Sequence, residues 1–134
     1  MKVAGKVLVV TKDLFFTARI GETARLTGTT VEFARSTEEL EARLAGGSPD
    51  LLIVDLTIQG WDYEAVFAAL ERREVRAPIL AFTTHVLAKS TRPYHGRADR
   101  VVTKETFTRE LPRILTAGVS PRERALEEVS DDIG

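Results

Sequence analysis

Short apolar runs alternate along the chain with longer segments in which apolar residues recur at helical spacing. Residues 7–10, 51–54 and 79–82 are apolar throughout. A strand that is apolar on both faces is typical of a parallel sheet covered by helices on both sides, so these runs predict three central strands. Residues 31–35 alternate apolar and polar side chains and residues 101–103 form only a short run, which indicates two edge strands.

The order of these segments predicts one α/β domain. Strands that alternate with helices along a chain form a parallel sheet. Three interior and two edge strands fit a flavodoxin-like five-stranded sheet of order 2-1-3-4-5, numbered along the chain, with helices on both faces. We assign residues 1–117 to this domain and residues 118–134 to a short polar tail.

Capping residues predict where several helices begin. Ser36 with Glu39 has the pattern of a capping box, and Asp62 can cap the helix that follows it. Pro112 lies in the last helical segment, where it is tolerable only in a first turn. Thr108 is therefore the predicted N-cap of a final helix that runs to residue 117.

Composition limits the class of protein. The chain has 134 residues, of which 43% are hydrophobic and 29% charged, and this suits a single domain with its own core. It has no cysteine, which excludes disulfides and thiolate metal sites. The net charge of −1 gives no sign of nucleic-acid or membrane binding, and the first apolar run ends at Lys12, far short of a membrane span. We therefore expect a soluble cytoplasmic protein.

Polar residues gather where the predicted strands end. In open α/β sheets, ligands bind outside the carboxyl ends of the strands, near the point where the strand order reverses. Here that point lies between the first and third strands. The residues that leave the strand ends are Thr11, Lys12, Asp13, Asp55, Thr83, Thr84, Thr103 and Lys104. One crevice is therefore expected to hold carboxylates, hydroxyls and positive charges.

Three of these residues carry a resemblance to a known family. Asp55, Thr83 and Lys104 are separated by 28 and 21 residues, and over about residues 5–117 the chain resembles the receiver domain of two-component response regulators. The resemblance implies that Asp55 stands at the phosphoacceptor position, which a histidine kinase phosphorylates with Mg²⁺ bound beside it. It also implies that Thr83 and Lys104 bind the phosphoryl oxygens and move the last two strands and helices.

The pocket departs from the receiver pattern at several positions. Thr11 and Lys12 stand where receivers carry two acidic residues, with Asp13 one place later. Val101 replaces the switch aromatic, and Glu105 replaces the usual proline after the lysine. A β-branched valine has few rotamers and cannot swing a ring between two positions. The chain therefore resembles a degenerate receiver, or pseudo-receiver.

The altered charges predict a pocket without a metal ion. Asp55 with Lys12 and Lys104 gives a net charge of about +1. A unit charge about 4 Å away changes the free energy of a bound cation by roughly 4 kcal/mol at an effective dielectric of about 20. Mg²⁺ also needs several oxygen ligands in octahedral geometry, which one aspartate cannot supply. We expect Lys12 to occupy the metal position in an ion pair with Asp55, and we expect no cofactor and no catalytic residue.

Simpler interpretations of the same residues stay open. Asp55 could merely cap a turn at the end of its strand, and Asp13 is more consistent with a helix N-cap than with a metal ligand. Trp61 could be a binding anchor or an aromatic side chain that covers its loop. His85 and His95 have no carboxylate at ligand spacing, so they do not predict a zinc site.

Charge is unevenly distributed along the chain. Residues 36–74 contain nine acidic residues and three arginines, whereas residues 85–113 contain seven basic and three acidic residues. In receivers the second stretch forms the output face, and a basic face favours an acidic protein partner or a homodimer over nucleic acid. The basic residues expected on this output face are Lys89, Arg92, Arg97, Arg100, Arg109 and Arg113.

Three functions are compatible with these patterns. The favoured one is a signalling protein-interaction module that is not an enzyme and works without Mg-dependent phosphorylation. The second is a conventional receiver phosphorylated on Asp55 by a histidine kinase. The third is a flavodoxin-like enzyme or small-ligand binder, but no glycine motif for nucleotides and no serine or cysteine nucleophile motif supports it.

Overall fold

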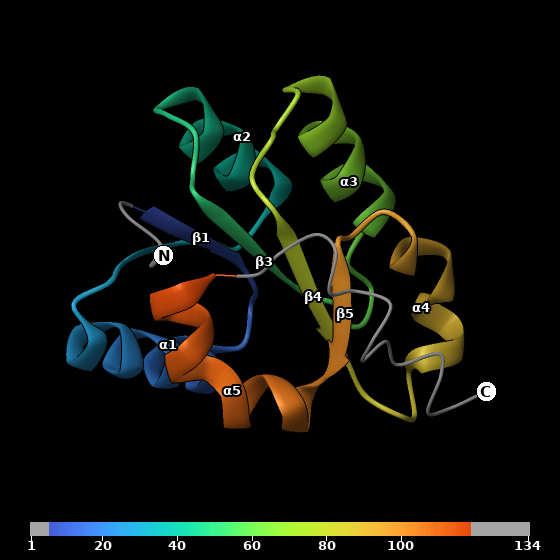
Figure 1. The fold of residues 1–134 in the computed structure, drawn as a ribbon. Coiled ribbons are helices and arrows are strands. Elements are labelled where there is room, and N and C mark those ends of the chain that lie inside the picture. The colour runs from blue at the N-terminus through green and yellow to red at the C-terminus, as the bar shows by residue number, and fades with distance from the viewer. Residues whose placement is uncertain (1–5, 119–134) are drawn as a thin grey trace.

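The computed structural model describes residues 6–118. They form one parallel sheet of five strands in the order β2-β1-β3-β4-β5, with a helix after each strand (Figure 1). The strands are β1 (Lys6–Val10), β2 (Thr30–Ala34), β3 (Leu51–Asp55), β4 (Ile79–Thr83) and β5 (Arg100–Thr103). The helices are α1 (Leu14–Thr27), α2 (Thr37–Ala45), α3 (Tyr63–Arg72), α4 (Ala88–His95) and α5 (Lys104–Ala117).

The predicted fold class is confirmed. All strands pair in parallel, with β1 between β2 and β3, and with β4 between β3 and β5. The two edge strands are β2 and β5, as the sequence pattern predicted. Each observed strand differs from its predicted run by no more than one residue at either end.

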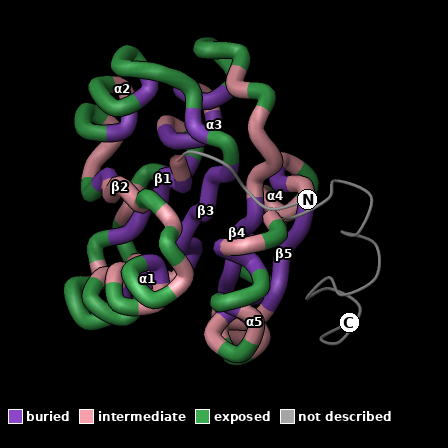
Figure 2. Tube along the Cα trace, turned by 60° about the vertical axis from the view of Figure 1, so that its left-hand side comes forward, coloured by how far each residue is buried: buried purple, intermediate pink, exposed green. Residues whose placement is uncertain are grey.

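Helices cover both faces of the sheet and bury its central strands. Alternate side chains of a strand point to opposite faces. Leu52 and Val54 of β3 therefore join a cluster with α2, α3 and α4, whereas Leu51 and Ile53 join a cluster with α1 and α5. Figure 2 shows the interior strands as buried between more exposed helices. Burial on both faces explains why these strands are apolar throughout.

Polar side chains fix the first turns of four helices. The N-cap residues that accept a hydrogen bond from a backbone N–H of the first turn are Asp13, Ser36, Asp62 and Thr103. The first three agree with the sequence interpretation. The capping box is modified, because the Glu39 carboxylate accepts from the N–H of Arg35, one residue before the N-cap.

The predicted start of the last helix is wrong. α5 begins at Lys104 with Thr103 as its N-cap, so Pro112 lies inside the helix and not in its first turn. Thr108 is a helical residue whose Oγ1 donates to the Lys104 carbonyl at 2.9 Å. The earlier start allows Phe107 to be buried completely beneath the sheet, and this burial offsets the hydrogen bond that a proline cannot make.

The described residues end one position beyond α5. That helix ends at Ala117, and residues 119–134 of the assigned tail lie outside the described part of the chain. Within residues 6–118, no helix is both long and apolar enough to cross a membrane.

Candidate functional site

The carboxyl edge of the sheet brings together the residues that the sequence singled out. Asp55 is the last residue of β3, and Thr83 is the last residue of β4. Asp55 pairs with Phe82 in the register, so Thr83 stands one residue further along the neighbouring strand. Thr11 directly follows β1, and Lys104 directly follows β5. The topology therefore gathers all four at the edge where ligands bind in such sheets.

The Asp55 carboxylate is buried and engaged by hydrogen-bond donors on both oxygens. Asp55 is 0% exposed. Its Oδ2 accepts from Oγ1 of Thr11 at 2.7 Å, and its Oδ1 accepts from the backbone N–H and Oγ1 of Thr57 at 2.8 and 2.6 Å. These donors offset the cost of burying the charge. The bond from the Thr57 N–H also caps the turn after β3, as the simpler interpretation of Asp55 proposed.

Lys12 does not form the predicted ion pair with Asp55. Its side chain is exposed, and its Nζ lies 4.9 Å from the ring centre of Trp61 in a cation–π contact. No ion pair within the described residues joins Asp55 to Lys12 or to Lys104. The reason is side-chain direction, because successive residues that leave a strand point to opposite sides, and here Thr11 faces the carboxylate.

Lys104 pairs instead with the neighbouring acid. Its Nζ lies 3.7 Å from Oδ2 of Asp13 and 4.8 Å from the ring centre of Phe16. The other oxygen of Asp13 accepts from the N–H of Phe16 at 3.0 Å, which makes Asp13 the N-cap of α1. The predicted charge count omitted Asp13. With it, two lysines at this edge face two aspartates, Asp13 and Asp55.

Tyr63 closes the loop that follows Asp55. Its hydroxyl donates to the Asp55 carbonyl oxygen at 2.6 Å and accepts from the N–H of Ile58 at 3.0 Å. Burial raises the pKa of Tyr63 well above its usual value, and the negative charge of Asp55 adds to this increase. A neutral phenol therefore ties the first turn of α3 to the end of β3.

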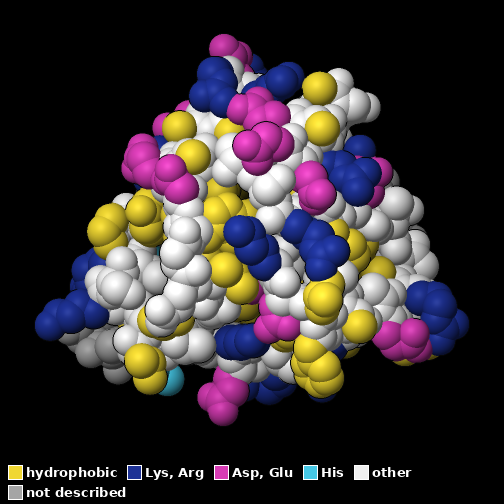
Figure 3. Space-filling model, turned by 180° about the vertical axis from the view of Figure 1, so that it is seen from behind, with side chains coloured by type: hydrophobic (Ala, Val, Ile, Leu, Met, Phe, Trp, Pro, Cys, Tyr) yellow, Lys and Arg dark blue, Asp and Glu magenta, His cyan; other side chains and the backbone are white. Residues whose placement is uncertain are grey.

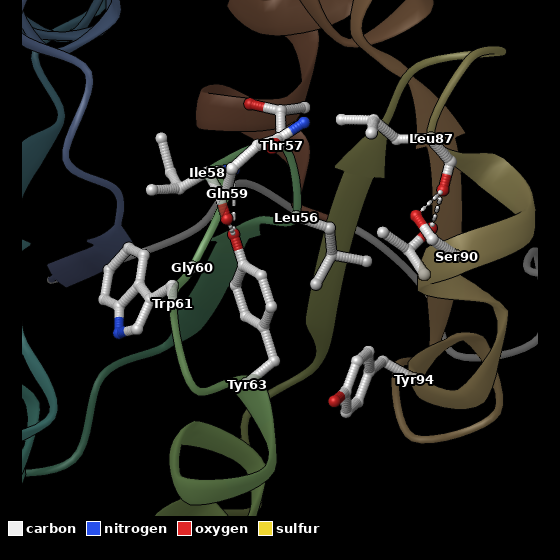
Figure 4. Close-up of a pocket in the computed structure, with 11 residues that line it drawn as sticks. Leu56, Thr57, Ile58, Gln59, Gly60, Trp61, Tyr63, Leu87, Ser90 and Tyr94 are labelled. Atoms are coloured by element: carbon white, nitrogen blue, oxygen red, sulfur yellow. Dashed lines mark hydrogen bonds between the residues drawn. The ribbon is translucent and has the colours of Figure 1, made fainter.

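A groove of about 420 Å³ lies between this loop and α4. Trp61, Tyr63 and Tyr94 line it, and Figure 4 shows the Tyr63 hydroxyl turned toward Ile58. Adjacent ring centres in this row are 5.7 Å apart. Trp61 thus covers its loop, which was one of its two interpretations, and the ring contacts connect the loop to α4.

Comparisons with known proteins identify the fold. No protein-family model and no curated protein matches the chain. Among solved structures, the chemotaxis response regulator CheY4 of Vibrio cholerae matches with a TM-score of 0.64 and 24% identity, over 83% of this chain and 98% of that chain. The receiver domain of the Francisella response regulator 1452 matches with a TM-score of 0.67 and 17% identity, over 83% and 93%. The chain has the response-regulator receiver fold.

A third neighbour extends this result. The signal receiver domain of an HD domain-containing protein from Pseudomonas fluorescens has a TM-score of 0.66 and 18% identity, over 83% of this chain and 86% of that chain. At such identities the likeness concerns the fold alone. The function of this receiver fold therefore has to be argued from its residues.

Of the three predicted phosphoryl and switch positions, Thr83 and Val101 are buried, whereas Lys104 is partly exposed. The Thr83 hydroxyl lies 3.2 Å from the hydroxyl of Thr91 in α4, which in turn lies 2.9 Å from Nε2 of His95. Burial, with the positive charge of Arg92, lowers the pKa of His95. Val101 is 2% exposed and packs in the cluster with α3 and α4. Thr83 is therefore hydrogen-bonded to the helix that follows it.

The predicted basic output face is less basic than its sequence suggests. Arg100 is 2% exposed, with Nη2 3.4 Å from Glu110, so its assignment to the surface was wrong. Arg97 pairs with Glu64 at 2.8 Å and with a second glutamate of α3 at 3.1 Å. Arg113 pairs with Glu110 at 2.6 Å. The cause is that segments far apart in the sequence meet in the fold and pair their charges.

The remaining cations of this set are exposed. Lys89 and Arg92 lie on α4, and Arg109 lies on α5 at 4.0 Å from Glu110. Figure 3 shows the face opposite to that of Figure 1, where positive and negative side chains are interspersed. The exposed cations of the predicted output face are Lys89, Arg92, Arg109 and Arg113.

Three residues of the site were not predicted. Thr57 follows Asp55 by two residues, which is the spacing of an Asx-turn, so the sequence did contain a signal for it. Tyr63 was expected on one face of the helix that Asp62 caps, together with Phe67 and Leu70, but its contact with the loop after β3 was not predicted. Thr91 gave no signal, because its contact with Thr83 depends on how α4 packs against the sheet.

Proposed function

We propose that this domain is a cytoplasmic signalling module that binds another protein through the receiver fold, without Mg-dependent phosphorylation and without enzymatic activity. The observation that carries the proposal is the engagement of the Asp55 carboxylate. Both of its oxygens accept hydrogen bonds from Thr11 and Thr57 in a buried position. A carboxylate in this state contributes to the fold, and a new ligand would have to compete with the hydrogen-bond donors that both of its oxygens already have.

The donor set at this edge does not suit Mg²⁺. The two oxygens of Asp13 are also engaged, one as the cap of α1 and the other beside Lys104. Mg²⁺ requires near-octahedral oxygen ligands, so it would compete with Thr11 and Thr57 for the oxygens of Asp55. Within residues 6–118, no three His, Cys, Asp or Glu side chains are grouped as metal ligands. We therefore propose no reaction step that passes through a metal ion.

The exposed cations of α4 and α5 support the choice of partner. Lys89, Arg92 and Arg109 are exposed, and Arg113 is exposed although it is paired within α5. We propose that they face an acidic protein surface or a second copy of this chain, because complementary charge guides and orients protein association. Arg97 and Arg100 are not part of this proposal.

A conventional receiver, phosphorylated on Asp55 by a histidine kinase with Mg²⁺, is the second candidate. One observation favours it, namely that Asp55, Thr83 and Lys104 stand where three adjacent strands end. Phosphorylation of one oxygen would compete with the hydrogen bonds to that oxygen, which come from Thr11 at Oδ2 and from Thr57 at Oδ1.

Intact mass after incubation with a small phosphodonor and Mg²⁺ distinguishes the two candidates. The proposal predicts no phosphoryl adduct on the parent, as on the Asp55→Asn control. An adduct of one phosphoryl group on the parent that is absent from Asp55→Asn would establish the conventional receiver.

Partner binding tests the interaction surface separately. Arg92→Glu should weaken binding of a partner to the immobilised domain, with or without phosphodonor. Arg76→Glu makes the same charge change at an exposed arginine after α3 and should leave binding unchanged. Equal loss in both variants would point to net charge, and binding that rises with phosphodonor would contradict the proposal.

A further inference from the structure

Two adjacent hollows lie between α1 and α5. Figure 1 shows the two helices on the same face of the sheet, and they are in contact. A hollow of about 710 Å³ lies where both helices begin, beside Phe15 and Lys104. A second hollow of about 430 Å³ lies nearer the end of α5, beside Pro112. Arg19 and Thr108 border both hollows, so together they form one groove.

The groove combines exposed apolar surface with positive charge. Phe15 at the start of α1 lines the larger hollow and is 80% exposed. The charged residues that line this hollow are Arg19, Lys104, Glu105 and Arg109. Three cations and one acid therefore lie beside an exposed phenylalanine, and Lys104 also pairs with Asp13. Exposed apolar surface with a charged rim marks a binding surface, and here it favours an occupant that is both apolar and acidic.

The sequence that follows α5 has this composition. Residues 119–134 contain five acidic and two basic residues. Ser120, Pro121 and Glu123 match the start of a helix, as N-cap, first-turn proline and capping-box glutamate. The apolar residues that then recur at the spacing of one helical face are Leu126, Val129 and Ile133. This pattern predicts an amphipathic segment.

We propose that residues 121–133 dock into the groove between α1 and α5, antiparallel to α5. The segment begins just after α5 ends at Ala117, so only a short turn is needed to reverse the chain. The 14 residues of α5 span about 21 Å at about 1.5 Å per residue. A helical segment of residues 121–133 spans about 20 Å on the same basis, and so matches the length of the groove.

The antiparallel direction also places the charges of the segment beside opposite charges of the hollows. Counted back from the turn, docking in this direction would bring Leu126 beside Pro112, Val129 beside Thr108, and Ile133 beside the start of α5. The acids of the segment that would then reach the cationic hollow are Glu127, Glu128, Asp131 and Asp132. The arginines at its start, Arg122 and Arg124, would come toward the hollow that Glu22 lines. A parallel arrangement would bring like charges together.

Docking would cover one side of the carboxyl edge of the sheet, where Asp55 lies. The end of the segment would lie beside Lys104, which pairs with Asp13 next to the site. A docked segment therefore competes with any partner that approaches Asp55 over α1. This inference does not depend on whether Asp55 is phosphorylated.

Paired cysteines test the docking, because the chain has no cysteine of its own. In the full chain, Thr108→Cys with Val129→Cys should form an intramolecular disulfide under mild oxidation. Its rate should exceed that of Glu38→Cys with Val129→Cys by about tenfold, because docking raises the effective concentration of the two thiols. Glu38 is an exposed residue of α2, across the sheet from the groove. Non-reducing gels and intact mass follow the reaction.

Charge reversal and a second pair complete the experiment. Asp131→Lys with Asp132→Lys, or added salt, should slow the disulfide between positions 108 and 129. Equal rates in the groove pair and the control pair would overturn the proposal. So would a disulfide that forms only between two chains, which would assign the groove to a second copy. Glu105→Cys with Ile133→Cys repeats the test if the Thr108→Cys protein loses its native circular dichroism.

Discussion

The two sides of the carboxyl edge of the sheet differ in how far their residues match the receiver pattern. On the side of β3, β4 and β5, Asp55, Thr83 and Lys104 match the pattern in sequence. On the side of β1, Thr11 and Lys12 stand in place of two acids. The β1 side contributes to the state of the shared carboxylate, because Thr11 donates to Asp55 and Lys12 turns away toward Trp61.

Because of this difference, Asp55 has a hydrogen-bond donor beside it where the receiver pattern has carboxylates. Oγ1 of Thr11 donates to Asp55 and accepts from the N–H of Asp13 at 3.1 Å, so a single hydroxyl joins the loop after β1 to β3. A carboxylate among other carboxylates is destabilised by repulsion, whereas one among donors stabilises the fold. We therefore interpret Asp55 as a structural hydrogen-bond acceptor.

Replacement of Asp55 by alanine should have the largest effect on stability. It leaves the donors of buried Thr11 and half-buried Thr57 without an acceptor, which should lower the free energy of unfolding by about 2–4 kcal/mol. Urea denaturation followed by Trp61 fluorescence measures this change. Glu105→Ala removes an exposed carboxylate at the same edge and should change stability by less than about 0.5 kcal/mol. An Asp55→Ala protein more stable than its parent would indicate repulsion at the site.

Thr11→Val should have the next largest effect. It removes the hydroxyl, keeps the shape of the side chain, and should cost about 1–2 kcal/mol. Thr11→Ser retains the donor and should recover part of that loss. In the double variant with Asp55→Ala, the two losses should overlap by about 1 kcal/mol. Strict additivity in this cycle would argue that Thr11 and Asp55 do not interact.

Tyr63→Phe tests the loop after β3 and should have a smaller effect, about 1 kcal/mol at neutral pH. The pKa of Tyr63 is raised in the folded protein, so the folded state keeps a proton that the unfolded state releases near pH 10. Its contribution is complete below that pH and is lost as the pH rises above it. The unfolding free energy of the parent should fall more steeply above about pH 10 than that of Tyr63→Phe. Identical slopes would contradict this assignment.

The fold could be predicted from the sequence because each central strand is buried on both faces. Continuous apolar runs such as residues 51–54 are the direct result of that burial, and they gave both the strands and their order. The capping residues Ser36 and Asp62 predicted where α2 and α3 begin. The start of α5 was predicted wrongly because burial of Phe107 outweighed the local preference of Pro112.

The site could be predicted only as far as the topology determines it. The strand ends bring Asp55, Thr83 and Lys104 to one edge, whatever their side chains contact. The contacts depend on side-chain direction, which directs Thr11 toward the carboxylate and buries Arg100. Local alternation places Thr11 and Lys12 on opposite sides. Which of the two faces Asp55, and whether Arg100 is buried, depends on packing between distant segments.

Titration with Mg²⁺ tests most directly whether Asp55 is a structural acceptor or a metal ligand. A ligand that binds only the folded state raises the thermal midpoint as its concentration passes the dissociation constant. At matched ionic strength, we predict that millimolar Mg²⁺ leaves the midpoint of the parent unchanged. Lys12→Asp, which removes a positive charge and adds a carboxylate, should respond with a rise. A saturable rise in the parent that Asp55→Asn abolishes would contradict the account.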